Sequence, residues 1–93
     1  MNSLTRTGHF VIRNEKGLHA RPAALFVQAA SRYSSSISVQ NEETRVSADG
    51  KSVMSMLMLA APRGARILIT ACGEDAEDAL RKLGDLVDRG FDE

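Results

Sequence analysis

The amino-acid sequence predicts an α+β fold in two layers, with an antiparallel four-stranded sheet and helices on one face. Short segments of alternating apolar and polar residues, typical of strands, are separated by segments with helical spacing. Their predicted order is β-α-β-β-α-β-α, and a hairpin inside such an order favours antiparallel pairing with the helices on one side. With 93 residues the chain can build a single core, so we expect one domain over residues 1–93.

The first strand is predicted at residues 9–13, whose sequence HFVIR is rich in strand-forming residues. A loop containing Gly17 follows. The segment 21–33, RPAALFVQAASRY, is rich in alanine and predicts a helix. Four of its residues recur at helical spacing: Ala24, Leu25, Gln28 and Ala29.

The next two strands are predicted at residues 37–40 and 44–48. The turn between them is short, so we expect an antiparallel hairpin. In the second of these strands the alternation points Val46 and Ala48 inward.

A helix, a strand and a longer helix make up the rest of the chain. Ser52 is a preferred N-cap residue in front of the apolar run VMSMLML. Residues 66–72 alternate as a strand does, with every second residue apolar. The final helix starts near Asp75 and ends near Gly90. Its apolar residues have amphipathic spacing: Ala76, Ala79, Leu80, Leu83 and Val87.

Composition limits the classes of function. Twelve basic residues balance twelve acidic ones, which disfavours nucleic-acid binding through a basic surface. No apolar run approaches the roughly 20 residues of a membrane span, and residues 1–8 lack the core of a signal peptide. We therefore expect a soluble cytoplasmic protein. His9, His19 and the single Cys72 are scattered, so we expect no metal site and no cofactor.

The most informative motif is GLHARP, residues 17–22. Proline is favoured in the first turn of a helix, which places His19 at or just before a helix N-terminus. Unpaired N–H groups and the helix dipole make such an end attractive to phosphate. An imidazole with an unperturbed pKa of about 6.5 is a neutral nucleophile at cytosolic pH. With Arg21 two positions on, the motif predicts a site that carries or contacts a phosphoryl group.

The chain resembles the histidine-containing phosphocarrier (HPr) family of the phosphoenolpyruvate-dependent phosphotransferase system. The resemblance rests on GLHARPAALFVQAASRY, GKSVMSMLML and PRGARILITACGEDAEDAL, and it covers residues 9 to about 90. It implies an open-faced β-sandwich with sheet order 1-4-2-3 under three helices. Some features match the branch that serves sugar transport, others the branch linked to nitrogen regulation, so the branch stays open.

The resemblance also implies roles for named residues. His19 would take a phosphoryl group on Nδ1 from phospho-enzyme I and pass it to an enzyme IIA domain, and Arg21 would assist. In one branch the serine matching Ser52 is phosphorylated by a serine kinase/phosphorylase. From the residues themselves we expect the N–H groups of Ala20 and Arg21 to receive phosphate. We expect the protein to act as a monomer and as a carrier, not as an enzyme.

Residues 53–59 are apolar nearly all round, whereas a helix on a core needs only one apolar stripe. We therefore expect some of Val53, Met54 and Leu57 to be exposed, and methionine suits a surface that meets several partners. The resemblance implies that these residues form a docking patch beside His19. A wholly buried helix is the alternative.

Other interpretations stay open at this point. His19 alone would be a helix-capping histidine, Arg21 a solvated residue and Ser52 a plain N-cap. A regulator that binds partners without transferring phosphate is a second class of function, and a small hydrolase using His19 is a third. For His9 we expect a structural or solvated role, and for Cys72 a small buried residue.

Overall fold

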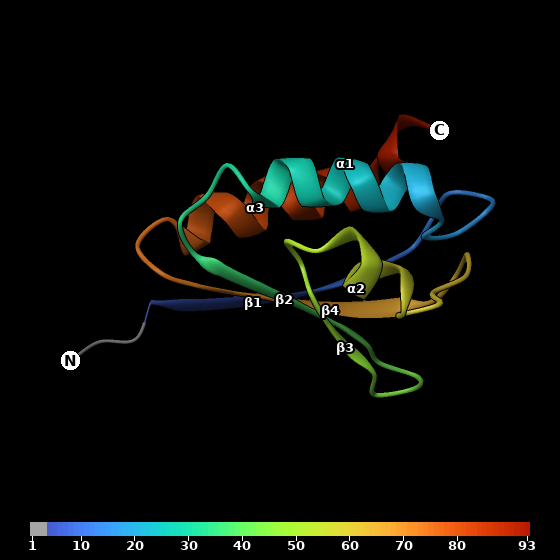
Figure 1. Ribbon diagram of the computed structural model, residues 1–93, viewed down its shortest axis with the longest axis horizontal. Coiled ribbons are helices and arrows are strands. Elements are labelled where there is room, and N and C mark those ends of the chain that lie inside the picture. Colours follow the sequence, from blue (N-terminus) through green and yellow to red (C-terminus); the bar gives the residue numbers. More distant parts are fainter. Residues whose placement is uncertain (1–3) are drawn as a thin grey trace.

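The computed structural model describes residues 4–93, so residues 1–3 of the expected domain lie outside the described part. Within residues 4–93, one antiparallel sheet of four strands lies under α1 and α3, and α2 packs beside α1 on the same side (Figure 1). The strand order β1-β4-β2-β3 confirms the predicted fold class and topology. The elements are β1 Thr5–Val11, α1 Ala20–Ala30, β2 Ser36–Asn41, β3 Ser47–Asp49, α2 Val53–Leu57, β4 Arg66–Cys72, α3 Ala76–Asp88 and the 3₁₀ turn η1 Gly90–Asp92.

β4 is the strand that the alternation of residues 66–72 predicted, and it lies in the interior of the sheet. It pairs with β1 on one side and with β2 on the other. Ile67 and Ile69 are buried on the helix side of the sheet, next to Val39 of β2. From the opposite layer Phe26 of α1 and Leu83 of α3 complete an aliphatic and aromatic core. Burial of these side chains is what fixes both long helices over the sheet.

The first strand begins four residues earlier than predicted, at Thr5, and ends at Val11. Its early residues are polar and mostly exposed, so they carry no buried alternation that a sequence could reveal. They are held by backbone pairing instead, with Thr7 opposite Thr70 of β4. Ile12 lies just past the strand and bonds to the loop before β4, accepting from the N–H of Gly64 at 2.7 Å.

The prediction for the third strand was wrong at residues 44–46. These residues form a turn in which the N–H of Arg45 donates to the carbonyl of Asn41 at 2.8 Å. Arg45 has a φ of 67°, which a strand does not allow. Val46 is consequently exposed instead of inward, whereas Ala48 is buried as predicted.

The helix predicted at residues 21–33 is α1, which begins at Ala20 and ends at Ala30 instead of residue 33. Gln28 is exposed. The buried residues are Pro22, Ala23, Phe26 and Ala30. Among residues 4–93, no helix has the length and apolar character needed to cross a membrane.

Candidate functional site

The loop before α1 places His19 at the start of the helix. The N–H of Gly17 donates to the carbonyl of Asn14, closing a tight turn, and the N–H of Leu18 donates to Ala61 at 2.9 Å. Gly17 has a φ of 71°, and a Cβ atom there would lie 2.6 Å from the carbonyl oxygen of Ala61. Only glycine fits this crossing of two loops. With Leu18 buried beneath it, His19 becomes the N-cap residue of α1, as the motif predicted.

The first turn of α1 leaves donors free. The N–H groups of Ala20 and Arg21 have no hydrogen-bond partner among residues 4–93, and Pro22 has no N–H to offer. The His19 side chain does not cap the helix. The open end therefore keeps two N–H groups and the positive end of the helix dipole available to an anion.

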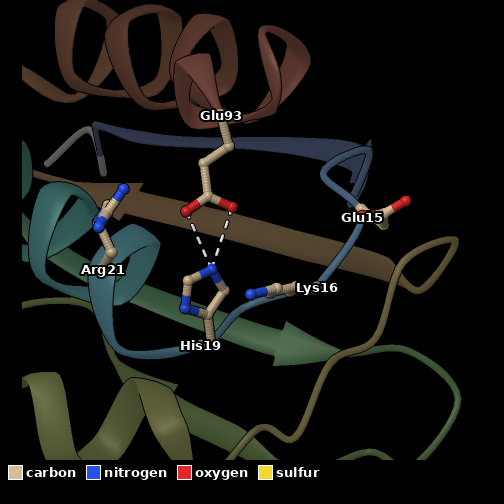
Figure 2. Close-up of a pocket in the computed structure, with 5 residues that line it drawn as sticks. All are labelled: Glu15, Lys16, His19, Arg21 and Glu93. Atoms are coloured by element: carbon tan, nitrogen blue, oxygen red, sulfur yellow. Dashed lines mark hydrogen bonds and ion pairs between the residues drawn. The ribbon is translucent and has the colours of Figure 1, made fainter.

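The His19 ring is held by a carboxylate from the other end of the chain. Its Nε2 lies 3.0 Å from Oε1 and 2.9 Å from Oε2 of Glu93 (Figure 2). An ionised carboxylate only accepts hydrogen bonds, so Nε2 carries the proton. In the neutral ring the lone pair is then on Nδ1. Figure 2 shows this second nitrogen on the α1 side of the ring, away from Glu93.

These groups line an open cleft of about 490 Å³ formed by Glu15, Lys16, His19, Arg21 and Glu93. The His19 side chain is 36% exposed, so a partner can reach it. Lys16 and Arg21 lie on opposite sides of the ring, and neither cation has a hydrogen-bonded partner among residues 4–93 (Figure 2). The hydrogen bond from His19 lowers the pKa of Glu93, helped by Asn14 and by the charge of Arg21, while partial burial opposes them.

Sequence reasoning missed three members of this cleft. Glu93 lies 74 positions after His19, and no spacing rule joins residues that far apart. Glu15 and Lys16 stand in the loop before the motif, where isolated charges are usually solvated. The motif around His19 predicted a site at the helix N-terminus, but it gave no information on the other residues that line the cleft.

Ser52 is the N-cap of α2, as predicted, and its Oγ accepts from the N–H of Ser55 at 3.1 Å. The predicted docking residues behind it differ in exposure. Met54 is 77% exposed and Leu57 is 37% exposed, whereas Val53 is half-buried against the core. Met58, which the sequence analysis did not single out, is 74% exposed. α2 therefore presents an apolar patch of Met54, Leu57 and Met58 beside α1.

Two secondary expectations change. Nδ1 of His9 lies 2.9 Å from Oε1 of Glu42, so the fold supplies an acidic neighbour that the sequence did not place near it. The prediction that Cys72 is buried was wrong, because its side of β4 faces solvent. Within residues 4–93, no three side chains of His, Cys, Asp or Glu gather closely enough to bind a metal ion.

Comparison with known proteins identifies the family. Residues 7–89 match the family model for the PTS HPr component phosphorylation site. The chain belongs to the HPr family. It is 45% identical over 83 residues to the phosphocarrier protein HPr of Pseudomonas aeruginosa, covering 88% of this chain and 90% of that protein. It is 42% identical over 88 residues to a multiphosphoryl transfer protein of Salmonella typhimurium, covering 94% of this chain but only 23% of that protein.

Solved structures of the family have the same fold. HPr-C-His from Thermoanaerobacter tengcongensis has a TM-score of 0.88 at 40% identity, covering 95% of this chain and 97% of that one. HPr from Bacillus anthracis gives 0.84 at 37% identity, covering 90% and 98%. A structure of Crh from Bacillus subtilis, described as a swapped dimer, gives 0.72 at 38% identity and covers 85% and 88%.

Proposed function

We propose that this chain is a phosphocarrier of the phosphoenolpyruvate-dependent phosphotransferase system, with His19 as the residue that carries the phosphoryl group. It would accept the group from phospho-enzyme I and pass it to an enzyme IIA domain. One observation carries the proposal: a solvent-accessible imidazole stands at an open helix N-terminus with its Nδ1 lone pair directed toward that end. Family membership supplies the chemical class.

Each group in the site has a task in this proposal. Nδ1 of His19 attacks the phosphorus, and the bond from phosphorus to the donor enzyme breaks as the new one forms. Phosphoryl transfer depends mostly on positioning and charge stabilisation. The N–H groups of Ala20 and Arg21 and the Arg21 guanidinium meet the phosphoryl oxygens. These contacts are few, which suits a carrier that must release its group.

The apolar patch of Met54, Leu57 and Met58 is our proposed docking surface for the partner enzymes. Flexible thioether side chains adapt to differently shaped partners. Val53 is half-buried, so its contribution is packing rather than contact with a partner. We propose a cytoplasmic location and no turnover by the chain itself, with residues 1–93 acting as one domain. Two solved relatives are described as dimers, so the monomer we expect is also a proposal.

Ser52 is our proposed regulatory phosphorylation site, for the branch that has a serine kinase/phosphorylase. Its hydroxyl is half-buried and already engaged in capping α2. A phosphate there is compatible with the helix N-terminus and adds up to about two negative charges beside the apolar patch. Docking of an apolar or acidic partner surface would weaken as a result.

The test is incubation with enzyme I and phosphoenolpyruvate carrying a labelled phosphate. We expect an acid-labile, alkali-stable label on the intact chain and none on His19→Ala. His9→Ala is the matched control, because it removes the other histidine of the sequence and must keep the label. A label that persists in His19→Ala would contradict the proposal.

A further inference from the structure

We propose that Glu93 is a positioning residue for His19, and that residues 89–93 form a clamp that holds its carboxylate on Nε2. The inference rests on the proposed transfer through Nδ1 of His19, and it assigns the reason why that nitrogen is the nucleophile. In an unrestrained histidine either ring nitrogen can carry the proton. No residue of the motif at residues 17–22 contacts the ring so as to fix that choice.

The first step is the contact itself. Both carboxylate oxygens of Glu93 lie within 3.0 Å of Nε2, so the acceptor remains in place if the carboxylate rotates. The Glu93 side chain is 18% exposed and that of His19 is 36% exposed, so the contact is partly exposed and solvent can reach it from one side. As long as Glu93 is ionised, the proton stays on Nε2 and the lone pair on Nδ1.

Asn14 holds Glu93 from the loop that precedes His19. Its Nδ2 donates to Oε1 of Glu93 at 3.0 Å and to the carbonyl of Gly17. The Oδ1 atom of Asn14 is buried and has no partner among residues 4–93. A buried polar atom without a partner is unfavourable, and such atoms are concentrated where a function requires them. Asn14 thus gives up one hydrogen bond in order to direct its amide N–H groups at Gly17 and Glu93.

The backbone after α3 is built to bring Glu93 to this place. Gly90, Phe91 and Asp92 have φ values of 63°, 57° and 58°, so two residues other than glycine adopt the left-handed region. Strain of this kind persists only where surrounding contacts enforce it, and it is common at functional sites. Here burial of the Phe91 side chain provides one such contact.

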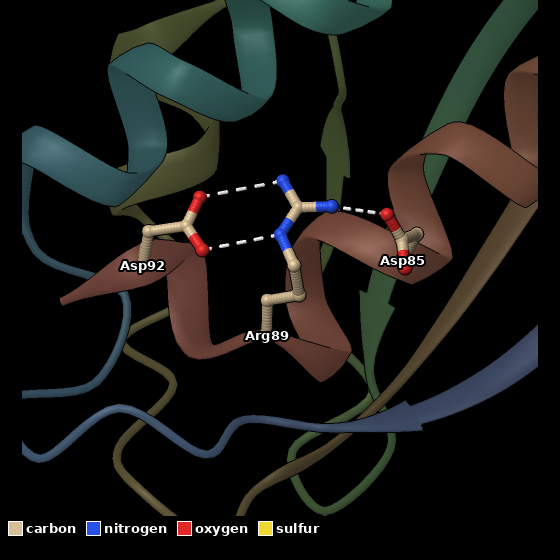
Figure 3. Close-up of polar contacts among 3 residues, drawn as sticks. All are labelled: Asp85, Arg89 and Asp92. Atoms are coloured by element: carbon tan, nitrogen blue, oxygen red, sulfur yellow. Dashed lines mark hydrogen bonds and ion pairs between the residues drawn. The ribbon is translucent and has the colours of Figure 1, made fainter.

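Arg89 provides the other contact, as Figure 3 shows. Its Nε donates to Oδ1 of Asp92 at 3.1 Å, and Nη1 donates to Asp85 one helical turn earlier. The guanidinium therefore ties the last turn of α3 to the residue before Glu93. The hydrogen bond to Asp92 and the charges of both aspartates raise the pKa of Arg89, so the guanidinium keeps its charge at any physiological pH.

The clamp has a consequence for the transfer step. When Nδ1 forms its bond to phosphorus, the bond from phosphorus to the donor breaks and its electron pair stays on the donor, while the proton of His19 stays on Nε2. The phosphorylated ring then carries positive charge next to the Glu93 carboxylate. That charge pair lies on the opposite side of the ring from the phosphoryl group, so it stabilises the product without blocking access.

The experiment compares Glu93→Gln with Glu15→Gln. Both changes neutralise one carboxylate of the same cleft, but Glu15 has no hydrogen-bond partner among residues 4–93. A glutamine amide both donates and accepts, so it no longer dictates the tautomer. We measure the imidazole ¹⁵N chemical shifts of His19 above its titration range, and the rate of phosphorylation by enzyme I.

For Glu93→Gln we expect a mixture of tautomers and a transfer rate lower by about tenfold, the low end of the loss seen when a metal-ligating histidine loses the partner that orients its ring. Arg89→Ala should move both quantities in the same direction by a smaller amount. Glu15→Gln should leave the tautomer unchanged. A Glu93→Gln variant with the same tautomer and rate as the unmodified chain overturns the inference, even if His19 is labelled. Absence of label on His19 in the unmodified chain would overturn the proposed function instead.

Discussion

The N-termini of α1 and α2 differ in whether the side chain of the N-cap residue accepts a hydrogen bond from the first turn of the helix. Ser52 caps α2 with its own hydroxyl, which accepts from the N–H of Ser55. His19 occupies the N-cap position of α1, but its ring turns away to Glu93 and leaves two N–H groups unpaired among residues 4–93. The N-terminus of α2 is therefore capped by a side chain, whereas the N-terminus of α1 has no side-chain cap.

The difference shows how one fold separates a structural helix end from a functional one. A capped end has lower free energy, because its donors are satisfied without a ligand. The open end of α1 gives up that stabilisation and gains a place where phosphoryl oxygens find donors and positive charge. Phosphorylation of Ser52 would have to alter a hydrogen bond that already holds α2, whereas the proposed phosphorylation of His19 would supply acceptors to N–H groups that have none among residues 4–93.

The largest effect in this comparison is expected when the open end loses its cation. Arg21→Ala removes a guanidinium that has no hydrogen-bonded partner in residues 4–93 and lines the His19 cleft. A charge-assisted hydrogen bond contributes about 1.5–3 kcal/mol, so we expect transfer to slow by roughly 10- to 100-fold. The measurement is the rate of phosphorylation by enzyme I, together with urea unfolding.

Arg32→Ala is the matched control, because Arg32 is an exposed arginine just past the other end of α1. It should change neither rate nor stability. If Arg21→Ala lowers the free energy of unfolding as much as it lowers transfer, the residue is structural and the open end does not depend on it.

The next largest effect tests the closed end. Ser52→Ala deletes the cap of α2 and should cost about 0.5–2 kcal/mol of unfolding free energy. His19→Ala should cost less, because the ring caps nothing and its contact with Glu93 is partly exposed. Urea unfolding of both variants at neutral pH measures the difference. Equal losses would mean that the two ends are not energetically distinct.

How much of this was predictable varies from element to element, for physical reasons. β4 and α3 were predicted well because buried and exposed residues alternate with the period of the element, as Ile67 and Ile69 do. β1 and β3 lie at the edges of the sheet and include polar, exposed residues, so their bounds depend on backbone pairing that composition does not encode.

The candidate site divides in the same way. His19 and Arg21 were predicted because a proline next to them reports a helix start within a few residues. Glu93 reaches the ring only through the tertiary fold, after a turn with three successive positive φ angles. Local signals therefore predicted His19 and the helix end, whereas the contact between Glu93 and His19 could be found only in the folded structure.

At the N-terminus of α3 the N-cap side chain bonds to a neighbouring loop instead of to its own helix. Its removal is the variant for which we expect the smallest effect. Its N-cap Asp75 turns to the neighbouring loop, where its carboxylate accepts from the hydroxyl of Ser35 and from the N–H groups of Ser34 and Ser35. The Ser35 hydroxyl, followed by the Ser34 N–H, lowers the pKa of Asp75 from 3.8 to about 2.

Below pH 4 the unfolded chain therefore binds this proton more readily than the folded chain. The stabilisation by Asp75 is complete above about pH 4 and is lost as the pH falls from 4 to 2. In Asp75→Asn this part of the pH dependence should disappear, which urea unfolding at pH 6, 4, 3 and 2 measures. Asp78→Asn is the control, since Asp78 is an exposed first-turn carboxylate bonded only to Arg81 within the described residues. If Asp75→Asn loses as much unfolding free energy in acid as the unmodified chain does, the carboxylate of Asp75 does not fix the loop to α3.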